Sequence, residues 1–426
     1  MDIQEWDTIS IIDVASVNAQ LGASLNKLID SFDYEGTSAF GGSYTISGEF
    51  GPWQVSGGSD QLLKLDLPIL KGTLSAGGHS TDISGMTVTV EVTLNLLPSA
   101  TNTKVTELRF DFKVAGSKDS PAAPGLVRPI ACSDPNKTGE SSYVMDAVAA
   151  VLAHNGSEIS YVFAEIGLVD LTIPSWLTPV RSRYSYQQPT GGKSGYLAVF
   201  SVTTDRNVSG LSTQIGSDLV SLNYPWSFLI SGPLFLEHVV LPMLPTAFSG
   251  TDASYFAFAN NSISISKPFN FKGVAPAGIT YIPVAQALAI AIDDNKLTNL
   301  TSGTVDLDMP NASMSFSVST QNVLQYNVST NSFSLLPDPS PVTSSEKNIP
   351  WYDYILIGLS GGIALSIFIA VINAVADDVR DAINSGGAGV RLSDAPAKVV
   401  AWSGMQSMTV REAGLSAAFW LRATSG

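Results

Sequence analysis

The chain has 426 residues, which is enough for two or three domains with a large core. Its formal net charge of −15 argues against nucleic-acid binding, because phosphates require clustered Lys and Arg, and against docking to an anionic membrane through a polybasic patch. Only 14% of the residues are charged, while Gly and Pro number 36 and 23, a composition typical of many short strands joined by turns.

The first strong pattern is an apolar stripe with spacings of three and four residues, which predicts a core-facing helix over Val14–Phe32. The stripe consists of Val14, Val17, Leu21, Leu25, Leu28 and Phe32. The ten residues that begin the sequence, MDIQEWDTIS, contain neither a basic nor a long apolar segment. We therefore expect no secretory signal, and a soluble protein that is cytoplasmic or released without a signal peptide.

Two long runs alternate strictly between apolar and polar residues, at Thr87–Leu97 and at Val105–Val114. A period of two with one polar face predicts antiparallel strands that are wet on one side. Strands of this length with one apolar face need a large apolar partner that covers this face. Further along the chain, the patterns at Tyr143–Leu152 and Val284–Ile292 predict helices, and short strands follow the second of these.

The longest apolar segment is Ile355–Ala376, which has no charged residue between Asp353 and Asp377. It is long enough to cross a bilayer, and it also has the composition of a helix buried on all sides within a sheet-wrapped fold. Its small residues from Gly358 to Ala370 suit helix pairing in lipid and equally suit close contact with strands. Acidic residues directly after the segment give a poor positive-inside signal, so we expect no stable transmembrane insertion.

A search for chemistry gives no catalytic or binding motif. The three histidines are isolated, and Gly192-Lys193-Ser194 lacks the first glycine of a phosphate-binding loop. Cys132 is the only cysteine, which rules out an intrachain disulfide and a multi-cysteine metal site. We therefore expect no catalytic residue, no metal site and no cofactor, and we expect that the protein is not an enzyme.

Together these patterns predict an α+β fold in which strongly curved antiparallel sheets wrap around long helices. We expect an elongated molecule of two wrapped units, residues 1–170 and 171–426, the second containing the long apolar helix 355–384. A tubular slot between sheet and helix could hold an acyl chain. Its expected lining consists of Val17, Leu21, Leu25, Leu28, Val90, Val92, Leu94, Phe110, Phe112, Ile363 and Ile367.

Four groups of residues recur as blocks of a known family: Trp6-Asp7-Thr8 with Val17-Asn18, Phe40–Trp53 (FGGSYTISGEFGPW), Leu62–Thr73 (LLKLDLPILKGT), and Ala413-Gly414-Leu415 with Phe419. These blocks resemble the accessory proteins of clostridial neurotoxin gene clusters that are named for a forty-seven-kilodalton protein. The family is similar to the tubular lipid-binding (TULIP) superfamily. The resemblance therefore implies a TULIP-like fold, in which a long helix is held in a wrapped sheet, usually in two copies.

The resemblance further implies a bacterial protein that binds lipid or another hydrophobic ligand, has protein partners from the same gene cluster, and carries no catalytic residues. Two alternatives stay open. The first is a protein–protein assembly factor whose interior is filled by side chains. The second is a membrane-anchored or pore-forming protein that uses residues 355–376.

Overall fold

We describe a computed structural model of the chain. The described residues are 3–37, 41–167, 174–188, 195–216, 219, 223–248, 250–275, 278–307, 311–329, 332–348, 369–370, 373, 376–377, 398–405 and 408–425. The chain divides into two compact units. Unit 1 comprises Met1–Asp7, Phe228–Ser393 and Val410–Arg422, and unit 2 comprises Thr8–Ser227, Asp394–Thr409 and Ala423–Gly426. The expected division into residues 1–170 and 171–426 stays a prediction.

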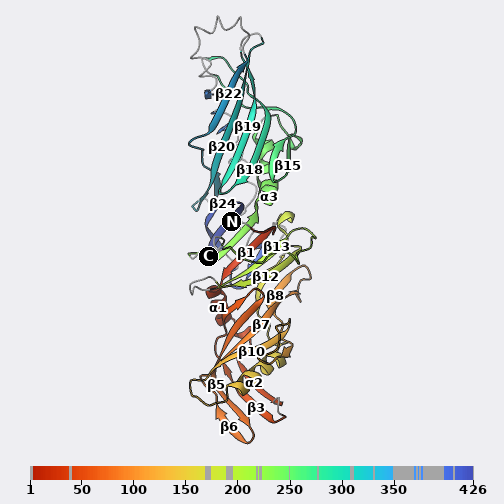
Figure 1. Ribbon diagram of the computed structural model, residues 1–426, viewed down its shortest axis with the longest axis vertical. Coiled ribbons are helices and arrows are strands. Elements are labelled where there is room, and N and C mark those ends of the chain that lie inside the picture. The colour runs from red at the N-terminus through yellow and green to blue at the C-terminus, as the bar shows by residue number, and fades with distance from the viewer. Residues whose placement is uncertain are drawn as a thin grey trace. The chain divides into compact units, whose positions relative to one another are not determined.

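Unit 2 is built mainly from strands and two helices (Figure 1). Its elements are β1 (Thr8–Asp13), α1 (Val14–Ala23), the short 3-10 helix η1 (Leu25–Lys27), β2 (Ser31–Thr37), β3 (Ser43–Phe50), β4 (Gln54–Ser59), β5 (Leu62–Ala76), β6 (His79–Asp82), β7 (Thr87–Pro98), β8 (Thr106–Phe110), β9 (Val114–Ala115), β10 (Leu126–Ser133), α2 (Ser141–His154), β11 (Val162–Ile166), η2 (Ser175–Leu177), β12 (Arg181–Gln187), β13 (Tyr196–Val202) and β23 (Val400–Trp402). Eleven strands form one sheet whose main path is β2-β3-β5-β7-β8-β11-β23, and α2 packs against β10 of that sheet.

Unit 1 contains an eight-stranded sheet with the main path β15-β16-β18-β19-β20-β21, in which β17 pairs with β18 and β22 with β20. Its elements are α3 (Gly232–Phe235), the π-helical turn η3 (Leu236–Val240), η4 (Leu241–Met243), α4 (Leu244–Ala247), η5 (Ala253–Tyr255), β15 (Phe256–Ala259), β16 (Ser262–Ile265), β17 (Phe269–Asn270), β18 (Val284–Asp293), β19 (Lys296–Asp306), β20 (Ser313–Asn327), β21 (Ser332–Leu335) and β22 (Val342–Asn348). Three further strands, β14 (Trp226–Ser231), β24 (Met408–Ser416) and β25 (Ala418–Ser425), have residues in both units.

The first helix is shorter than its apolar stripe predicts. Asp13 caps its N-terminus, because the Asp13 Oδ1 accepts a hydrogen bond of 2.8 Å from the Ser16 backbone N–H. The helix nevertheless ends at Ala23, and Phe32 lies in β2. The apolar stripe therefore keeps its helical spacing through the 3-10 helix η1 and into the strand β2, although the α-helix has already ended.

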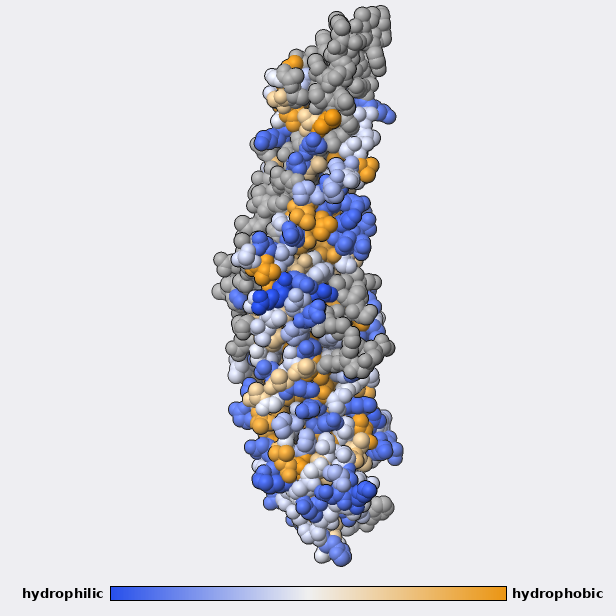
Figure 2. All heavy atoms as spheres, turned by 90° about the vertical axis from the view of Figure 1, so that its left-hand side faces the viewer, coloured by the Kyte–Doolittle hydropathy of each residue, from blue (hydrophilic) through white to orange (hydrophobic). Residues whose placement is uncertain are grey.

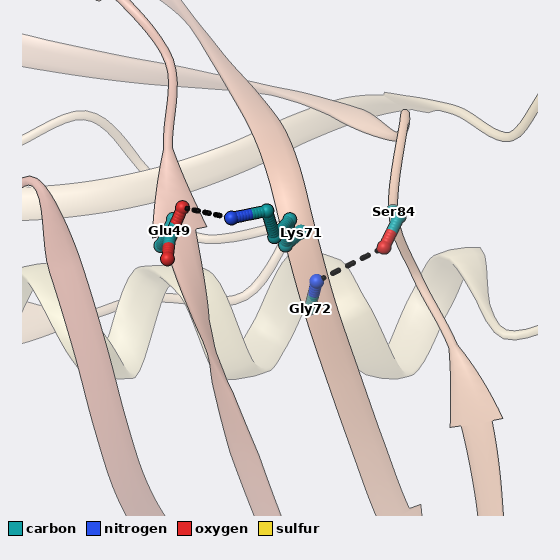
Figure 3. A network of polar contacts seen from close by, with 4 residues as sticks. All are labelled: Glu49, Lys71, Gly72 and Ser84. Atoms are coloured by element: carbon teal, nitrogen blue, oxygen red, sulfur yellow. Dashed lines mark hydrogen bonds and ion pairs between the residues drawn. The ribbon is translucent and has the colours of Figure 1, made fainter.

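A β-bulge in β5 reverses which residues face the core. Glu49 of β3 pairs with Lys71, while the next residue, Phe50, pairs with Ile69, so Leu70 is the extra residue. Leu70 is 57% exposed, whereas Ile69 is buried. Figure 3 shows the polar contacts around this bulge, where Lys71 Nζ lies 3.1 Å from Glu49 Oε2 and the Gly72 N–H donates to Ser84 Oγ at 3.1 Å.

The prediction of a helix over Val284–Ile292 is wrong, because this segment is the strand β18. The register of β18 against β19 shifts between Ala285 and Ala287, which marks a bulge. Ala285 is buried before the bulge, and Leu288 and Ile290 are buried after it, so the buried positions pass from odd-numbered to even-numbered residues. The resulting spacing of three residues imitates one turn of a helix.

The prediction of long helices wrapped by strongly curved sheets is also wrong for the part of the chain that the structure describes. Its longest helix is α2, with 14 residues, and antiparallel strands dominate both units. Of Ile355–Ala376, on which the prediction mainly depended, only residues 369–370, 373 and 376 are described, so both interpretations of that segment lie outside the described residues. Among the described helices, none combines the length and the apolar character that a membrane crossing requires.

Candidate hydrophobic site in unit 2

One face of the molecule shows no large hydrophobic patch among its described residues (Figure 2). On the face shown in Figure 2, hydrophobic residues form small patches separated by hydrophilic ones. No group of three or more His, Cys, Asp and Glu side chains suited to a metal ion occurs among the described residues. Burial raises the pKa of the Cys132 thiol, which disfavours the reactive thiolate.

Helix α1 is attached to the sheet of unit 2 through a side-chain amide. The Asn18 Oδ1 accepts from the Val55 backbone N–H at 2.7 Å, and the Asn18 Nδ2 donates to the Val55 carbonyl oxygen at 3.1 Å. These two bonds join α1 to β4 and fix the rotation of α1 about its own axis. Val17 and Leu21 are buried on this helix, as the stripe predicts.

Strands β7 and β8 supply the apolar wall of the candidate site. Val90, Val92 and Leu94 occupy alternate positions of β7 and are buried. Leu94 lies directly opposite Phe110 of β8 in the antiparallel register. Cross-strand neighbours of this kind have side chains in contact range, so β7 and β8 present one continuous apolar surface.

Aromatic side chains extend this surface into a connected cluster. Phe110 is its centre, with its ring centroid 4.9 Å from that of Phe112, 4.9 Å from that of Phe163 and 6.1 Å from that of Trp53. The remaining members of the cluster are Phe32, Phe50 and Tyr161. All seven rings are buried. Edge-on and tilted contacts between buried rings stabilise such clusters beyond the burial of area alone.

One polar atom in the cluster has no partner. Trp53 is 1% exposed, and its indole Nε1 lies buried without a hydrogen-bond acceptor among the residues that the structure describes. A buried indole N–H normally finds an acceptor, because leaving it unpaired costs about 1–3 kcal/mol. The cluster is therefore a closed apolar core that contains one unpaired indole N–H.

The cluster holds one further polar side chain that titrates, the phenol of Tyr161. Burial raises the pKa of Tyr161 to about 12, although a hydrogen bond with Ser403 acts in the opposite direction, so the phenol is neutral at physiological pH. The low-dielectric surroundings that keep this phenol neutral suit the hydrocarbon part of a ligand.

The structure brings together part of the expected lining. Val90, Val92, Leu94, Phe110 and Phe112 form one aliphatic and aromatic surface, and Val17, Leu21 and Leu28 are buried in the same unit. Leu25 is 39% exposed in η1 and does not line an interior. Ile363 and Ile367 lie outside the described residues.

Sequence reasoning missed Trp53, Tyr161 and Phe163 as members of the cluster. Trp53 follows Gly51-Pro52 and belongs to no periodic run, so no pattern assigned it to a face. Tyr161 precedes β11 and Phe163 lies within it, and their spacing of two residues was the available signal.

Comparisons with known proteins relate the chain to one group. A family model described as "OrfX-like: Protein OrfX2/OrfX3/P47" matches residues 3–333. Protein P47 of Clostridium botulinum (strain Kyoto / Type A2) is 24% identical over 366 residues, which are 82% of this chain and 84% of that protein. The structure of P47 from Clostridium botulinum A2 matches with a TM-score of 0.80 and 22% identity, covering 100% of this chain and 98% of that one. For P47 of Clostridium botulinum E1 the TM-score is 0.78 and the identity 21%, with 99% and 100% covered.

Proposed function

This chain belongs to the OrfX2/OrfX3/P47 family, and from that premise we propose that it is a non-enzymatic accessory protein of a toxin gene cluster that binds a lipid or another hydrophobic ligand. Its relation to P47 supports the accessory role. The buried aromatic cluster of unit 2 supports the choice of ligand class.

The observation that carries the ligand proposal is the unpaired Trp53 Nε1 within an apolar surface. A ligand with an alkyl chain and one acceptor would satisfy this donor while its methylenes contact Val90, Val92 and Phe110. Each methylene removed from water contributes about 0.8 kcal/mol, so ten methylenes provide ample gross affinity before the cost of ordering. This is the chemistry of fatty acids and their esters.

Quenching of tryptophan fluorescence by a brominated fatty acid tests this proposal directly. Bromine quenches an indole only at contact, so 9,10-dibromostearate bound beside the cluster should quench Trp53 selectively. The variant Trp53→Phe should remove most of the saturable quenching. The matched control is Trp176→Phe, which removes a half-buried tryptophan of the same unit at η2 and should leave the quenching unchanged.

Two experimental results would contradict this proposal, and each has a different meaning. If wild-type protein shows no saturable quenching and takes up no fatty acid or phosphoinositide from vesicles, the ligand proposal is wrong. If quenching is saturable but equal in Trp53→Phe, a hydrophobic ligand binds at another place.

A second candidate function, assembly with other proteins of the gene cluster, has its own supporting observation. The chain carries 37 acidic and 22 basic residues, and a surface of this balance attracts a basic partner. Co-purification of neighbouring gene products should then weaken between about 0.05 M and 0.5 M salt, since screening shortens the range of the attraction. A membrane anchor at 355–376 would instead make the protein float with liposomes.

A further inference from the structure

Four neighbouring strands of the unit 1 sheet, β18, β19, β20 and β22 (Figure 1), share a side that faces solvent. The orientation is clearest in β19, where the odd-numbered residues from Leu297 to Val305 are buried and the even-numbered ones are not. Alternate residues of a strand point to opposite faces, so the even-numbered residues of β19 lie on the solvent-facing side. We call this side of the four strands the outer face of unit 1.

Two adjacent rows of residues cross the outer face, and they differ in bulk. Direct pairing across the strands aligns the bulky row, which consists of Ala289, Leu300, Ser319 and Val342. The small row lies two residues further along β19 and consists of Ala287, Ser302, Ser317 and Ser344. Leu300 is 53% exposed and Val342 is 73% exposed, so the bulky row holds two aliphatic side chains in water. The small row has no side chain larger than that of serine.

The outer face carries opposite charges at the two ends of β19. Lys296 is the first residue of this strand and Asp306 is the last, and both are even-numbered. A strand rises about 3.3 Å per residue, so about 33 Å separates the two charges and they cannot pair within one chain. Lys296 Nζ instead donates to the neutral Gln321 Oε1 at 2.7 Å. The outer-face residues of β19 between the two charges are uncharged, namely Thr298, Leu300, Ser302 and Thr304.

This pattern is complementary to a second copy of itself. Consider a two-fold axis that lies between two outer faces and runs across their strands, so that β19 of one copy lies antiparallel over β19 of the other. With the axis midway between the bulky and the small row, the bulky row of each copy lies over the small row of the other, and Leu300 meets Ser302. The same axis places Lys296 of each copy beside Asp306 of the other, which makes two identical ion pairs at the rim.

The chemistry of the outer face also favours a second copy over other occupants. Serine and threonine hydroxyls both donate and accept hydrogen bonds, so one array of them can satisfy an identical array. The alanines lose no rotamer freedom on burial. The whole chain has a net charge of −15, which repels a second copy, so contact is least opposed at a face whose few charges balance.

The size of the outer face sets the expected strength of such a contact. Four strands about 4.8 Å apart and up to about 36 Å long offer at most about 600 Å² per copy, or about 1,200 Å² in total. This area is at the lower end of the range for specific interfaces, so we expect a reversible dimer with a dissociation constant on the order of 10 µM.

We propose that the outer face of unit 1 is a homodimer interface, in which the bulky row of each copy packs on the small row of the other and Lys296 of each copy pairs with Asp306 of the other. This interface goes beyond the proposed function, because it requires neither a hydrophobic ligand nor a basic partner protein. Its occupant is a second copy of this chain.

Sedimentation equilibrium of the full chain measures the self-association directly. The concentration is varied from about 1 to about 200 µM, and a reductant prevents cross-linking through Cys132. Leu300→Gln replaces an exposed side chain at the centre of the outer face and should raise the dissociation constant at least about tenfold, because two leucines per dimer lose their apolar contact. The matched control is Leu70→Gln in unit 2, where the leucine is 57% exposed and the dimer should be unchanged.

Charge reversal tests the two-fold arrangement. Lys296→Asp leaves acidic groups at both ends of β19, and Asp306→Lys leaves basic groups at both ends, so each variant alone should dimerise about tenfold more weakly than wild type. An equimolar mixture of the two variants should recover the wild-type affinity, because each chain then meets opposite charges at both ends. The double variant Lys296→Asp/Asp306→Lys exchanges the two charges and should also dimerise like wild type.

Each outcome supports or overturns the inference. A wild-type chain that remains monomeric up to about 200 µM overturns it, and this result needs no variant to fold. A dimer that keeps its affinity in Leu300→Gln overturns it as well, because another surface then holds the copies together. A mixture of the two charge variants that dimerises no more tightly than either alone shows that the two-fold arrangement is wrong. If a neighbouring gene product binds in a Leu300-dependent way while the chain alone stays monomeric, the outer face has a different occupant and the inference fails. None of these results changes the test of ligand binding in unit 2, so the proposed function stands or fails separately.

Discussion

Replacing Ser10 with alanine should destabilise unit 2, because one hydroxyl oxygen accepts hydrogen bonds from two buried indoles. Ser10 Oγ accepts from Trp226 Nε1 at 3.2 Å and from Trp402 Nε1 at 2.9 Å. All three side chains are fully buried. The contacts join positions that are 216 and 392 residues apart in the sequence, so this oxygen links the beginning, the middle and the end of the chain within one unit.

The expected loss follows from these two bonds. Removing an acceptor from a buried donor costs about 1–3 kcal/mol, so two indole N–H groups that lose Ser10 Oγ should cost about 2–6 kcal/mol together. A typical domain is stable by only about 5–15 kcal/mol. The substitution Ser10→Ala should therefore remove a large fraction of the stability of unit 2.

Urea unfolding followed by tryptophan fluorescence measures this loss, with the denaturant slope checked to be unchanged. The control is Ser31→Ala in β2, whose exposed hydroxyl bonds only to the neighbouring Asp30 side chain and whose loss should stay within about 0.5 kcal/mol. If Ser10→Ala loses less than about 1 kcal/mol at an unchanged slope, the assignment of Ser10 as the shared acceptor is wrong.

Three further substitutions test other parts of the structure. Asn18→Ala should cost about 2–4 kcal/mol because it removes both hydrogen bonds to the Val55 backbone, and a loss below about 1 kcal/mol in chemical denaturation would contradict this. Gly48→Val should cost about 2 kcal/mol or more, because a Cβ there would collide with the Lys71 carbonyl oxygen, and an unchanged midpoint in calorimetry would argue against the close pairing of β3 with β5. Burial raises the pKa of Tyr161 to about 12, above its value in the unfolded chain. The stabilisation of the folded state by the neutral phenol is therefore complete below about pH 10. It is lost as the pH rises from about 10 to about 12, a change of about 2–3 kcal/mol in the free energy of unfolding. Tyr161→Phe should reduce this alkaline loss when unfolding free energies are compared at pH 9 and pH 11.5, and an equal loss in both proteins would refute the assignment.

Elements with one uninterrupted period were predictable from the sequence. The alternation in Thr87–Leu97 predicted the strand that the structure places at Thr87–Pro98, and the stripe in Tyr143–Leu152 predicted the helix at Ser141–His154. In both cases burial on one face is the physical cause of the pattern, and it acts along the whole element.

Elements with a local irregularity were not predictable in the same way. The bulge after Ala285 changes the phase of burial within one strand, and a phase change of one residue turns alternation into an apparent helical spacing. The stripe that ends at Phe32 crosses from a helix into a strand. Both errors contributed to the wrong prediction of long wrapped helices.

The buried face of a strand could likewise be predicted only where one of its two faces is clearly apolar. Val90, Val92 and Leu94 could be assigned to one face because they alternate on a strand whose other face is polar. In β19 both faces carry polar residues, and the structure buries Asn299 and Thr301 while it leaves Leu300 53% exposed. Hydropathy alone would choose the opposite face, since the leucine is the apolar residue of the three. Pairing with neighbouring strands, which the sequence does not encode locally, decides the orientation.

The central claim, that the interior of this protein receives a hydrophobic ligand, is tested most directly by organic extraction of the full chain purified without detergent, followed by mass spectrometry with an internal standard. The account predicts about one or more molecules of lipid per protein, and recovery of the same amount when extracted protein is incubated with lipid vesicles. Less than about one lipid per ten proteins before and after that incubation would contradict the claim.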